Sequence, residues 1–335
     1  CNRHEEWNGR HVALAANAAA FFYIYKPHFW ILVARTLPTL VWTMSPLDLS
    51  NLVSAMARVD RRDCRSLLLI ARICHSCARR NLFGQGTLAT TMNAFAKLDF
   101  NHPKLSKAFE NALVVRLDRA LEMGPDYRAQ RLQDSDVFDL QALVQILHVL
   151  VCFVGAADEI IEKLLTLISW SGRELSDHQR RLMKTTWIVI QKEHAELLKR
   201  LRREVRDGLR VLEVPAKVVP FESRWARELR NTLQKMDIIV ELEALVDDQV
   251  LDILLPTSKA VICPIGPYGY YASTTHRTAY SKLHQRLLEI SGYTCMVVPY
   301  YEWSELRMEE DKMVYLWSRG RRVAAGQSLE DGPAA

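Results

Sequence analysis

The sequence lacks a second CxxC motif to accompany the single pair in "CHSC", Cys74 and Cys77. A structural zinc site takes four ligands, commonly from two such pairs, so this pair predicts buried helix thiols. The seven cysteines form an odd set without framework spacing. In a chain of 335 residues this pattern favours reduced thiols in a reducing compartment over a secreted disulfide scaffold. The sequence predicts no metal and no other cofactor.

The sequence also lacks an uninterrupted apolar run long enough to cross a bilayer. Its most apolar stretch, residues 12–42, is split at Lys26–His28 and interrupted again at Arg35 and Pro38. Neither half reaches the ~20 apolar residues that a spanning helix needs. We expect a buried helix pair here and no membrane span, with an anchor lying on a membrane surface as the alternative.

A strong net charge is a third absence. The 44 basic and 39 acidic residues leave a formal charge of +5, which permits a polyanionic partner without requiring one. A hydrophobic content of 49% and a charged content of 25% are ordinary for a folded protein. The length suffices for two or three domains, so function has to be sought in local patterns.

The sequence does contain an internal repeat. "LSNLVSAMARVD" begins at Leu49 and "LATTMNAFAKLD" begins at Leu88, and an amphipathic stretch follows each of them. Weaker copies begin at Phe138, after a polar insertion, and at His178. A period near 40 residues built from helix pairs is typical of an α-solenoid, in which each pair buries its apolar stripe against the next.

The end of this helical half is strongly basic. We expect one long helix from Asp177 to Leu212. Residues 178–210 include ten Lys or Arg and only four acids. A solvated helix face explains such a run, and a stripe that contacts phosphates is the functional alternative. The candidate RNA contacts of this half are Arg180, Arg181, Lys184, Lys199 and Arg203.

Beyond Pro215 and Pro220, which bracket an extended link, the periodicity changes. "ESRWARELRNTLQKM" predicts a helix, and β-branched runs in "DIIVELEALVDDQVLDILLP", "KAVICPIG" and "YTCMVVPY" predict three strands. "HRTAYSKLHQRLLEISG" predicts a helix capped at Gly292, and "ELRMEEDKMVYLWSRGRR" predicts a closing helix. Together they make a small α/β domain.

The ordered series "LDILLP…AVICPIGP…KLHQRLLEISGYTCMVVPYYEW…YL" closely resembles the RAP domain, a module named for its abundance in apicomplexan parasites. That domain also closes the FAST-kinase-like mitochondrial proteins and several chloroplast RNA factors. The helix pairs resemble the degenerate heptatricopeptide- or octotricopeptide-style repeats that precede it. The resemblance implies an α-helical repeat array (α-solenoid) followed by a small α/β domain of restriction-endonuclease-like (RAP) type.

We therefore divide the chain into four predicted parts. They are an apolar N-terminal helical segment (1–44), a degenerate helical-repeat domain (45–213), a RAP-like α/β domain (221–320) and a flexible tail (321–335).

A nuclease-like fold raises the question of catalysis. Such a site needs an Asp near the end of one strand and an acid-x-Lys on the next, so that two carboxylates hold a divalent metal. Asp252 stands at the first position, but Cys263 and Ile265 replace the acids of the family pattern, and the lysine is missing. One carboxylate does not hold such a metal against water. The sequence predicts that the protein is not an enzyme.

Eight of the eleven tyrosines lie between Tyr268 and Tyr315. Tyrosine rings stack on single-stranded bases, although several must fill the core, with Tyr293 and Trp303 pointing inward. We expect the turn Tyr268–Tyr271 to be exposed, with His284 among the nearby cations. The candidate RNA contacts of this half are Tyr268, Tyr270, Tyr271, His276, Arg277, Lys282, Arg286, Arg319, Arg321 and Arg322.

The resemblance implies a non-catalytic RNA-binding scaffold of an organellar ribonucleoprotein in the mitochondrial matrix, with RNA and other ribonucleoprotein proteins as partners. Mitochondrial ribosomal RNA is fragmented in parasites that carry the family, so a mitochondrial ribosome component holding such fragments is the concrete version. One alternative is an RNA-processing or transcript-stability factor. Another is a protein–protein interaction subunit of a mitochondrial complex that docks through residues 12–42.

Overall fold

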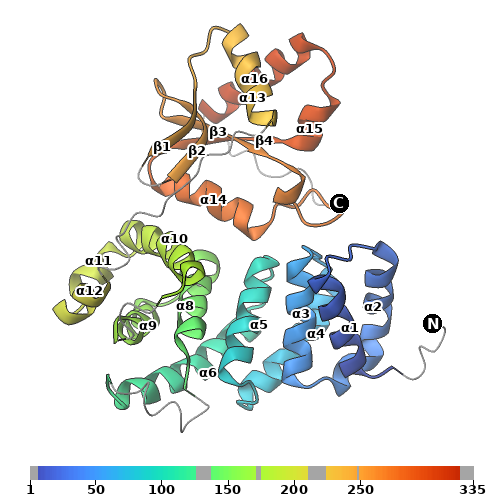
Figure 1. The fold of residues 1–335 in the computed structure, drawn as a ribbon, viewed down its shortest axis with the longest axis vertical. Coiled ribbons are helices and arrows are strands. Elements are labelled where there is room, and N and C mark those ends of the chain that lie inside the picture. Colours follow the sequence, from blue (N-terminus) through green and yellow to red (C-terminus); the bar gives the residue numbers. More distant parts are fainter. Residues whose placement is uncertain (1–6, 126–136, 171–174, 210–223, 247–248, 325–335) are drawn as a thin grey trace. The chain divides into compact units, whose positions relative to one another are not determined.

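The computed structural model describes residues 7–125, 137–170, 175–209, 224–246 and 249–324. The chain divides into two compact units, which we call the N-terminal unit (Cys1–Glu213) and the C-terminal unit (Val214–Ala335). Figure 1 shows that the first is built from helices and that the second contains a sheet with helices on both of its faces. The predicted link around Pro215 and Pro220 and most of the predicted polar insertion lie outside the described residues.

The N-terminal unit consists of helices joined by short turns. Its helices are α1 (Gly9–Phe21), α2 (Pro27–Leu40), α3 (Pro46–Arg58), α4 (Cys64–Arg79), α5 (Gln85–Lys97), α6 (Pro103–Glu122), α8 (Leu140–Val149), α9 (Asp158–Trp170), α10 (Asp177–Glu193), α11 (Ala195–Arg200) and α12 (Arg203–Leu209). A 3-10 turn, η2 (Val41–Thr43), follows α2, and a π-helical segment, η3 (Leu150–Val154), extends α8. No helix among the described residues is long and apolar enough to cross a membrane.

Several of these helices follow a residue whose side chain caps them. Ser45 accepts a hydrogen bond from the backbone N–H of Asp48 at 3.2 Å, and the Asp48 carboxylate accepts one from the N–H of Ser45 at 3.0 Å. This reciprocal pair satisfies two backbone donors that the helix itself leaves open. Ser176 caps α10 with the same reciprocal pair, whereas Asp63 and Asp139 cap α4 and α8 by accepting one backbone hydrogen bond each, so these helix starts follow from local sequence.

The helices pack in two rows. In one row α1 packs on α3, α3 on α5, α5 on α8 and α8 on α10, and in the other α4 packs on α6, α6 on α9 and α9 on α12. Figure 1 shows this alternation along the N-terminal unit. The expected helical composition of this half is confirmed, whereas its assignment to the α-solenoid class stays a prediction.

The 39-residue repeat is visible in the backbone conformation as well as in the amino-acid sequence. Asp60 after α3 and Asp99 after α5 both adopt left-handed conformations, with φ of 51° and 49°. In each copy the backbone N–H three residues past the helix, that of Arg61 or Phe100, bonds back to a carbonyl of the last turn, which satisfies an otherwise open acceptor. Arg62 of the first copy donates to the carbonyls of Leu98 and Asp99 at 3.0 and 3.3 Å. The two copies are therefore tied together by hydrogen bonds as well as by packing.

The single basic helix expected from Asp177 onward is wrong. The helix leaves its path at His194 and again at Leu201, which gives α10, α11 and α12, and residues 210–212 lie outside the description. The reason is a contact distant in sequence. Asp158 at the start of α9 binds His194 Nδ1 at 2.9 Å and Arg200 at 2.7 Å, and it fixes both ends of α11.

The predicted buried pair at residues 12–42 forms α1 and α2, but its tip is exposed. Val12, Ala13 and Ala16 of α1 are buried. The connection carries five exposed apolar or aromatic residues in succession, Phe21, Phe22, Tyr23, Ile24 and Tyr25. Burial of this segment is therefore limited to the helix bodies.

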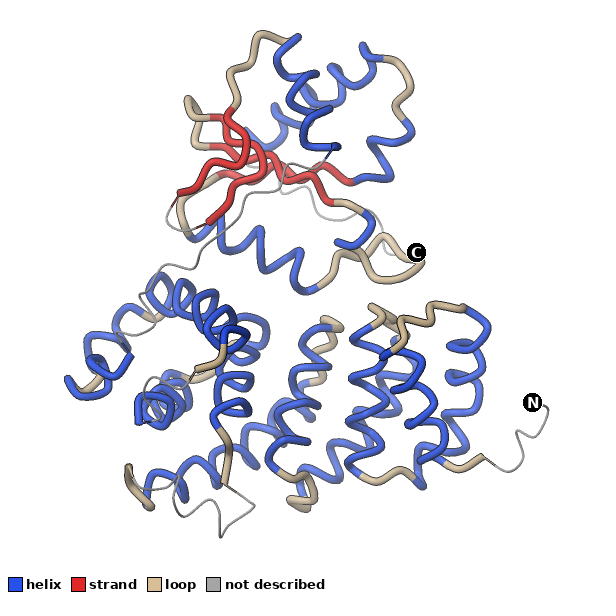
Figure 2. Tube along the Cα trace, in the orientation of Figure 1, coloured by secondary structure: helices blue, strands red, loops and turns tan. Residues whose placement is uncertain are grey.

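The C-terminal unit is a four-stranded mixed sheet with helices on both faces. Its strands β1 (Glu241–Val246), β2 (Gln249–Leu255), β3 (Ala260–Ile265) and β4 (Thr294–Pro299) lie in the order β1-β2-β3-β4. The first three are antiparallel neighbours and β3 pairs with β4 in parallel. Its helices are α13 (Arg224–Lys235), α14 (Ala279–Ile290), α15 (Tyr300–Glu305) and α16 (Glu309–Ala324). Figure 2 shows the strands gathered between helices.

The mixed α/β class is thus confirmed, with three differences in detail. The first β-branched run folds into two strands, because it is long enough to turn back on itself. The aromatic segment after β4 forms the short helix α15. Helix α16 extends to Ala324, so that residues 321–324 belong to it and not to the predicted tail. The Gly292 cap is correct: this residue follows α14 with φ of 89°.

Two separate cores lie on the two faces of the sheet. One comprises Leu229, Leu233, Ile253, Ile262, Met296, Val298, Trp303 and Leu316. The other comprises Leu251, Leu254, Val261, Cys263, Ile265, Tyr270, Leu288 and Val297. Helices α13 and α16 cover the first core and α14 covers the second. Trp303 is 4% exposed and points inward as expected, whereas Tyr293 is only partly buried.

Candidate RNA-binding surface

The turn after β3 exposes one tyrosine and buries two. Tyr268 is 96% exposed, but Tyr270 is 4% and Tyr271 is 1% exposed. The expectation that the whole turn faces solvent is therefore wrong. Gly269 explains the tightness of the turn, because a Cβ there would lie 2.4 Å from Cγ2 of Ile265. Tyr268 thus remains the stacking candidate of this turn.

The two buried tyrosines are held by elements that lie far along the chain. Tyr271 accepts a hydrogen bond through its hydroxyl from the N–H of Ala279, the first residue of α14, at 3.1 Å. The Tyr270 ring meets those of Tyr300 and Tyr301 edge to face, at centroid distances of 5.6 and 5.5 Å. The aromatic residues that follow β4 therefore form a core cluster with Tyr270.

Arg277 is also part of the interior. It is 6% exposed. Its guanidinium donates to the hydroxyl and the carbonyl of Ser281 at 3.1 and 2.7 Å, and to the side-chain oxygen of Gln285. A buried arginine with its donors so engaged fixes the start of α14, so its assignment as an RNA contact is wrong. Its neighbour His276 is half-buried.

Arg319 is likewise unavailable. Its side chain is 13% exposed and pairs with Glu302, while Tyr315 donates its hydroxyl to the same carboxylate at 2.6 Å. Burial, followed by this hydrogen bond, raises the pKa of Tyr315 well above its usual range. The group joins α15 to α16 as a structural network. The remaining cations of the set divide into exposed Lys282, Arg321 and Arg322 and half-buried Arg286.

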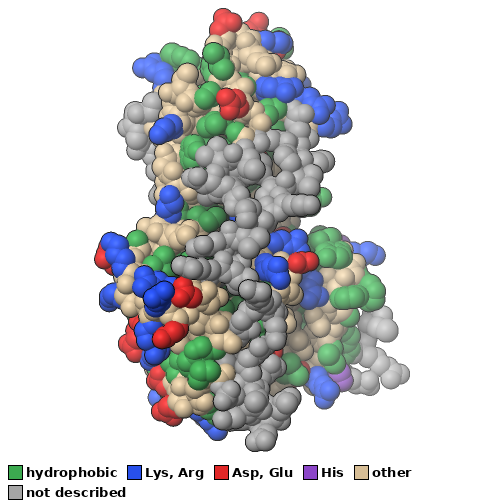
Figure 3. Space-filling view, turned by 60° about the vertical axis from the view of Figure 1, so that its left-hand side comes forward, with side chains coloured by type: hydrophobic (Ala, Val, Ile, Leu, Met, Phe, Trp, Pro, Cys, Tyr) green, Lys and Arg blue, Asp and Glu red, His purple; other side chains and the backbone are tan. Residues whose placement is uncertain are grey.

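The basic residues of the N-terminal unit differ in their availability. Arg180, Arg181, Lys199 and Arg203 are exposed. The Lys184 Nζ is enclosed by protein atoms and cannot reach a phosphate, so this assignment is wrong. Lys199 pairs with Glu196 at 2.6 Å, and Arg203 lies 3.7 Å from Asp207. Figure 3 shows Lys and Arg side chains interspersed with Asp and Glu on this face of the unit, so its local charge is partly neutralised.

Three potential metal ligands converge beneath α14, and the sequence patterns did not bring them together. The ligand atoms of Asp252 on β2, Cys263 on β3 and His284 on α14 all lie within 4.8 Å of one another. Cys263 is buried, and the other two are half-buried. A hydrogen bond with Cys295 and burial both raise the pKa of the Cys263 thiol well above its usual range. Pairing of β2 with β3 brings the first two together, and packing of α14 adds His284.

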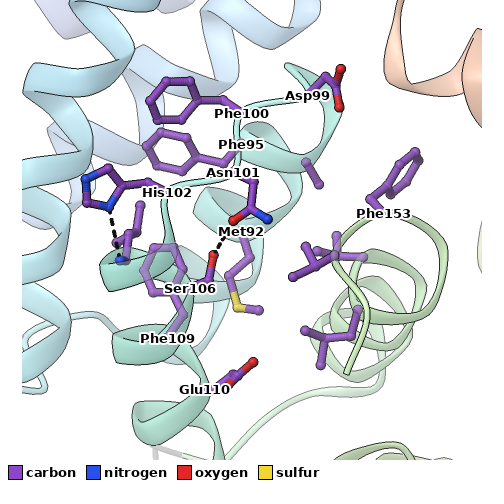
Figure 4. Close-up of a pocket in the computed structure, with 15 residues that line it drawn as sticks. Met92, Phe95, Asp99, Phe100, Asn101, His102, Ser106, Phe109, Glu110 and Phe153 are labelled. Carbon is purple, nitrogen blue, oxygen red and sulfur yellow. Dashed lines mark hydrogen bonds between the residues drawn. The ribbon is translucent and has the colours of Figure 1, made fainter. Parts of the chain in front are cut away.

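Two cavities have different characters. The cleft in Figure 4 lies in the N-terminal unit, where Phe95 of α5 and Phe100 after it line one side and Phe153 of η3 lines the other. Its volume of about 50 Å³ has room for a few water molecules and for nothing as large as a nucleobase. The other, of about 420 Å³, lies in the C-terminal unit between α13, α16 and the sheet, with Trp317 and Arg321 among its lining residues. Only the second of these two has room for a nucleobase.

Comparison with known proteins identifies the second half of the sheet and its helices. The family model of the RAP domain matches residues 262–318, which run from β3 through α14, β4 and α15 into α16. No match to a curated protein was found. The matched range includes Tyr268, Lys282 and Arg286 and leaves out Arg321 and Arg322. Residues 262–318 of the C-terminal unit are thus similar to the RAP domain, a module that is generally associated with RNA binding.

Proposed function

We propose that the protein is a non-catalytic RNA-binding scaffold of an organellar ribonucleoprotein. The match of residues 262–318 to the RAP domain carries this proposal. The exposed Tyr268 offers a ring for base stacking, and exposed Lys282 lies on the adjacent helix α14. A flat aromatic face beside cations suits single-stranded RNA, because stacking and phosphate contacts do not require a particular base.

The finer proposal is a mitochondrial ribosome component in the matrix that holds ribosomal RNA fragments. It rests on the resemblance of the helix pairs to the repeats that precede RAP domains in organellar RNA factors. The stacked rows α1-α3-α5-α8-α10 and α4-α6-α9-α12 support an α-solenoid, because each helix contacts mainly its neighbours in the row.

The absence of hydrolysis is part of the proposal. The acids expected opposite Asp252 are replaced by Cys263 and Ile265, which are buried. Mg²⁺ requires oxygen ligands in near-octahedral geometry, and a thiol beside one carboxylate does not supply them. An assay of the full chain on single-stranded RNA with Mg²⁺ or Mn²⁺ should show no cleavage. Cleavage that Asp252→Ala abolishes would establish the processing enzyme instead.

RNA binding is tested by its salt dependence. Phosphate contacts make the logarithm of the affinity fall with the logarithm of salt concentration, with a slope of about −0.7 per contact for single strands. We expect a steep slope for the full chain and a shallower one for Lys282→Glu with Arg322→Glu. Binding that does not respond to salt, or no binding at all, would contradict the proposal. Crosslinking in cells followed by sequencing of the attached RNA identifies the transcript.

A second candidate function is supported by the exposed residues Phe21 to Tyr25. A contiguous apolar surface of this kind often marks a protein interaction site, which favours an interaction subunit of a mitochondrial complex. Replacing Phe21 and Phe22 by serine should then release protein partners while leaving RNA affinity unchanged. The reverse result, loss of RNA without loss of partners, would favour the scaffold function alone.

A further inference from the structure

The strongest unassigned group of side chains in the described part of the chain lies on the α14 side of the sheet. Asp252, Cys263 and His284 contribute a carboxylate oxygen, a sulfur and an imidazole nitrogen, and these atoms lie within 4.8 Å of one another. They come from three elements separated in sequence, β2, β3 and α14. Convergence of three different ligand types distinguishes this cluster from a group of surface acids.

The chemistry of the ligands selects the class of metal. Hard cations such as Mg²⁺ and Ca²⁺ prefer oxygen ligands throughout. Sulfur and imidazole nitrogen together with one carboxylate suit Zn²⁺, which takes four ligands in tetrahedral geometry. Zinc bonds of about 2.0–2.3 Å place neighbouring ligand atoms roughly 3.5 Å apart. The three ligand atoms lie within 4.8 Å of one another, so metal binding requires the half-buried side chains of Asp252 and His284 to approach the Cys263 sulfur.

A further sulfur lies next to the cluster. Cys295 on β4 makes a side-chain hydrogen bond with Cys263. Its strand position pairs with Val261, two residues before Cys263, so both thiols lie on the same face of the sheet. Cys295 is half-buried, and its sulfur lies 3.9 Å from the carbonyl oxygen of Gln285, to which the thiol donates a weak hydrogen bond. A thiol with so weak a hydrogen bond is available as a fourth ligand, and water is the alternative.

We propose that Asp252, Cys263 and His284 form a Zn²⁺ site that clamps α14 to β2 and β3. The ion compensates the negative charges of the carboxylate and the thiolate that it brings together. The clamp holds the crossover helix against the two strands that it covers. This role is independent of RNA binding, and its test needs no RNA.

The test uses the purified full chain. We expect one zinc ion per chain by elemental mass spectrometry after extensive dialysis, and a lower Tm after removal with a chelator, because a metal bound to the folded state stabilises it. Co²⁺ in place of Zn²⁺ should give a near-ultraviolet thiolate-to-cobalt charge-transfer band. Absence of both the zinc and this band would overturn the proposal.

Variants assign the ligands. Cys263→Ser should abolish the charge-transfer band, and His284→Gln should reduce retained zinc to background. Cys263→Ser places a serine in the core and can disrupt folding. His284→Gln changes a half-buried side chain, so the test still stands on this variant, whose folding is checked by circular dichroism. The matched control is Cys64→Ser at an exposed thiol of α4, which should keep both signals. Zinc retained by His284→Gln, or a band that survives in Cys263→Ser, would refute this ligand set.

Cys295→Ser separates the two candidates for the fourth position. A weakened charge-transfer band identifies Cys295 as the fourth ligand, whereas an unchanged band indicates that water takes this position. Both outcomes support the site. Isolation of the native protein with Cys263 in a disulfide to Cys295 would overturn it, because the oxidised sulfur is no longer a thiolate ligand.

Discussion

The two units use their buried polar groups differently. In the N-terminal unit, buried Arg116 of α6 donates to the carbonyl of Phe83 in the turn before α5, and buried His148 of α8 bonds to Thr186 of α10 at 2.9 Å. In the C-terminal unit, by contrast, three potential metal ligands gather at a single place. Polar bonds between neighbouring elements hold the layers in register, whereas potential ligands from three elements at one place can form a site. The difference directs the search for chemistry to the sheet.

The largest expected effect tests whether the units are energetically separate. Trp303→Ala should destabilise the C-terminal unit by about 3–5 kcal/mol, because it removes a buried aromatic side chain and leaves a cavity. It also removes the hydrogen bond from the indole N–H to Glu228 at 3.2 Å. In a denaturant titration, the transition of this unit should shift while that of the other stays in place.

The matched control for this substitution is Trp317→Ala, since Trp317 is 58% exposed. It should change stability by less than about 0.5 kcal/mol. Transitions of both units that move together in Trp303→Ala would mean that the two units unfold as one.

The next effect concerns the polar interior of the N-terminal unit. Burial, followed by the charges of Lys97 and His178, lowers the pKa of His148 from 6.5 to about 4. Thr186 donates its own hydroxyl to the carbonyl of Leu182 at 2.8 Å, so His148 is the donor to Thr186 through Nδ1 and is neutral. The unfolded chain takes up a proton near pH 6.5, and the folded chain takes it up only near pH 4.

The contribution of His148 is therefore present above pH 6.5 and is lost as the pH falls toward 4. The loss amounts to about 3 kcal/mol. As the pH is lowered from 6.5 to 4, the Tm should fall less steeply for His148→Gln than for the wild type. His28→Gln, at an exposed position, serves as the control and should retain the full slope. Equal slopes in wild type and His148→Gln would show that other groups cause the acid sensitivity.

A smaller effect compares exposed aromatics of the two units. Tyr268→Ala should weaken binding of single-stranded RNA by about 1–3 kcal/mol, because a stacked base loses its platform, and should leave the Tm unchanged. Phe22→Ala, at a residue that is 70% exposed in the N-terminal unit, is the control and should bind RNA like the wild type. Equal losses from both variants would indicate that stacking is spread over the two units.

The smallest effect concerns single cations. Arg322→Ala should reduce the magnitude of the salt slope of RNA binding by about 0.7, the value of one phosphate contact. Arg203→Ala should reduce it less, because Asp207 lies 3.7 Å from that guanidinium and offsets its charge. Fluorescence titrations at several salt concentrations measure both. A larger change for Arg203 would place the main phosphate contacts in the N-terminal unit.

Prediction from the sequence succeeded where structure depends on neighbours along the chain. The predicted end of α14 is correct because Gly292 permits a positive φ there. The start of α3 is local in the same sense, since Ser45 and Asp48, which cap it, are three residues apart. Prediction failed where the structure depends on contacts between residues that are distant in the sequence. The break at His194 depends on Asp158, 36 residues earlier. Burial of Tyr270 depends on Tyr300 and Tyr301, which follow the whole of α14.

The candidate site follows the same division. Asp252 and Cys263 attract notice in the sequence through the missing nuclease pattern, because they occupy strand positions where acids are expected. His284 was noticed only as one cation among several. A helix carries its residues through all directions every 3.6 positions, so the sequence could not tell that this one lies against the two strands.

The parallel pairing of β3 with β4 also affects the order in which the chain folds. Pairing of β1, β2 and β3 needs only short turns, but β4 emerges from the ribosome after the full length of α14. Until it arrives, β3 is an open edge carrying Val261, Ile262 and Cys263, a surface that can pair with another chain. Substitutions that slow the folding of α14 are therefore expected to lower the yield of soluble protein even where they leave the equilibrium stability of the folded protein unchanged.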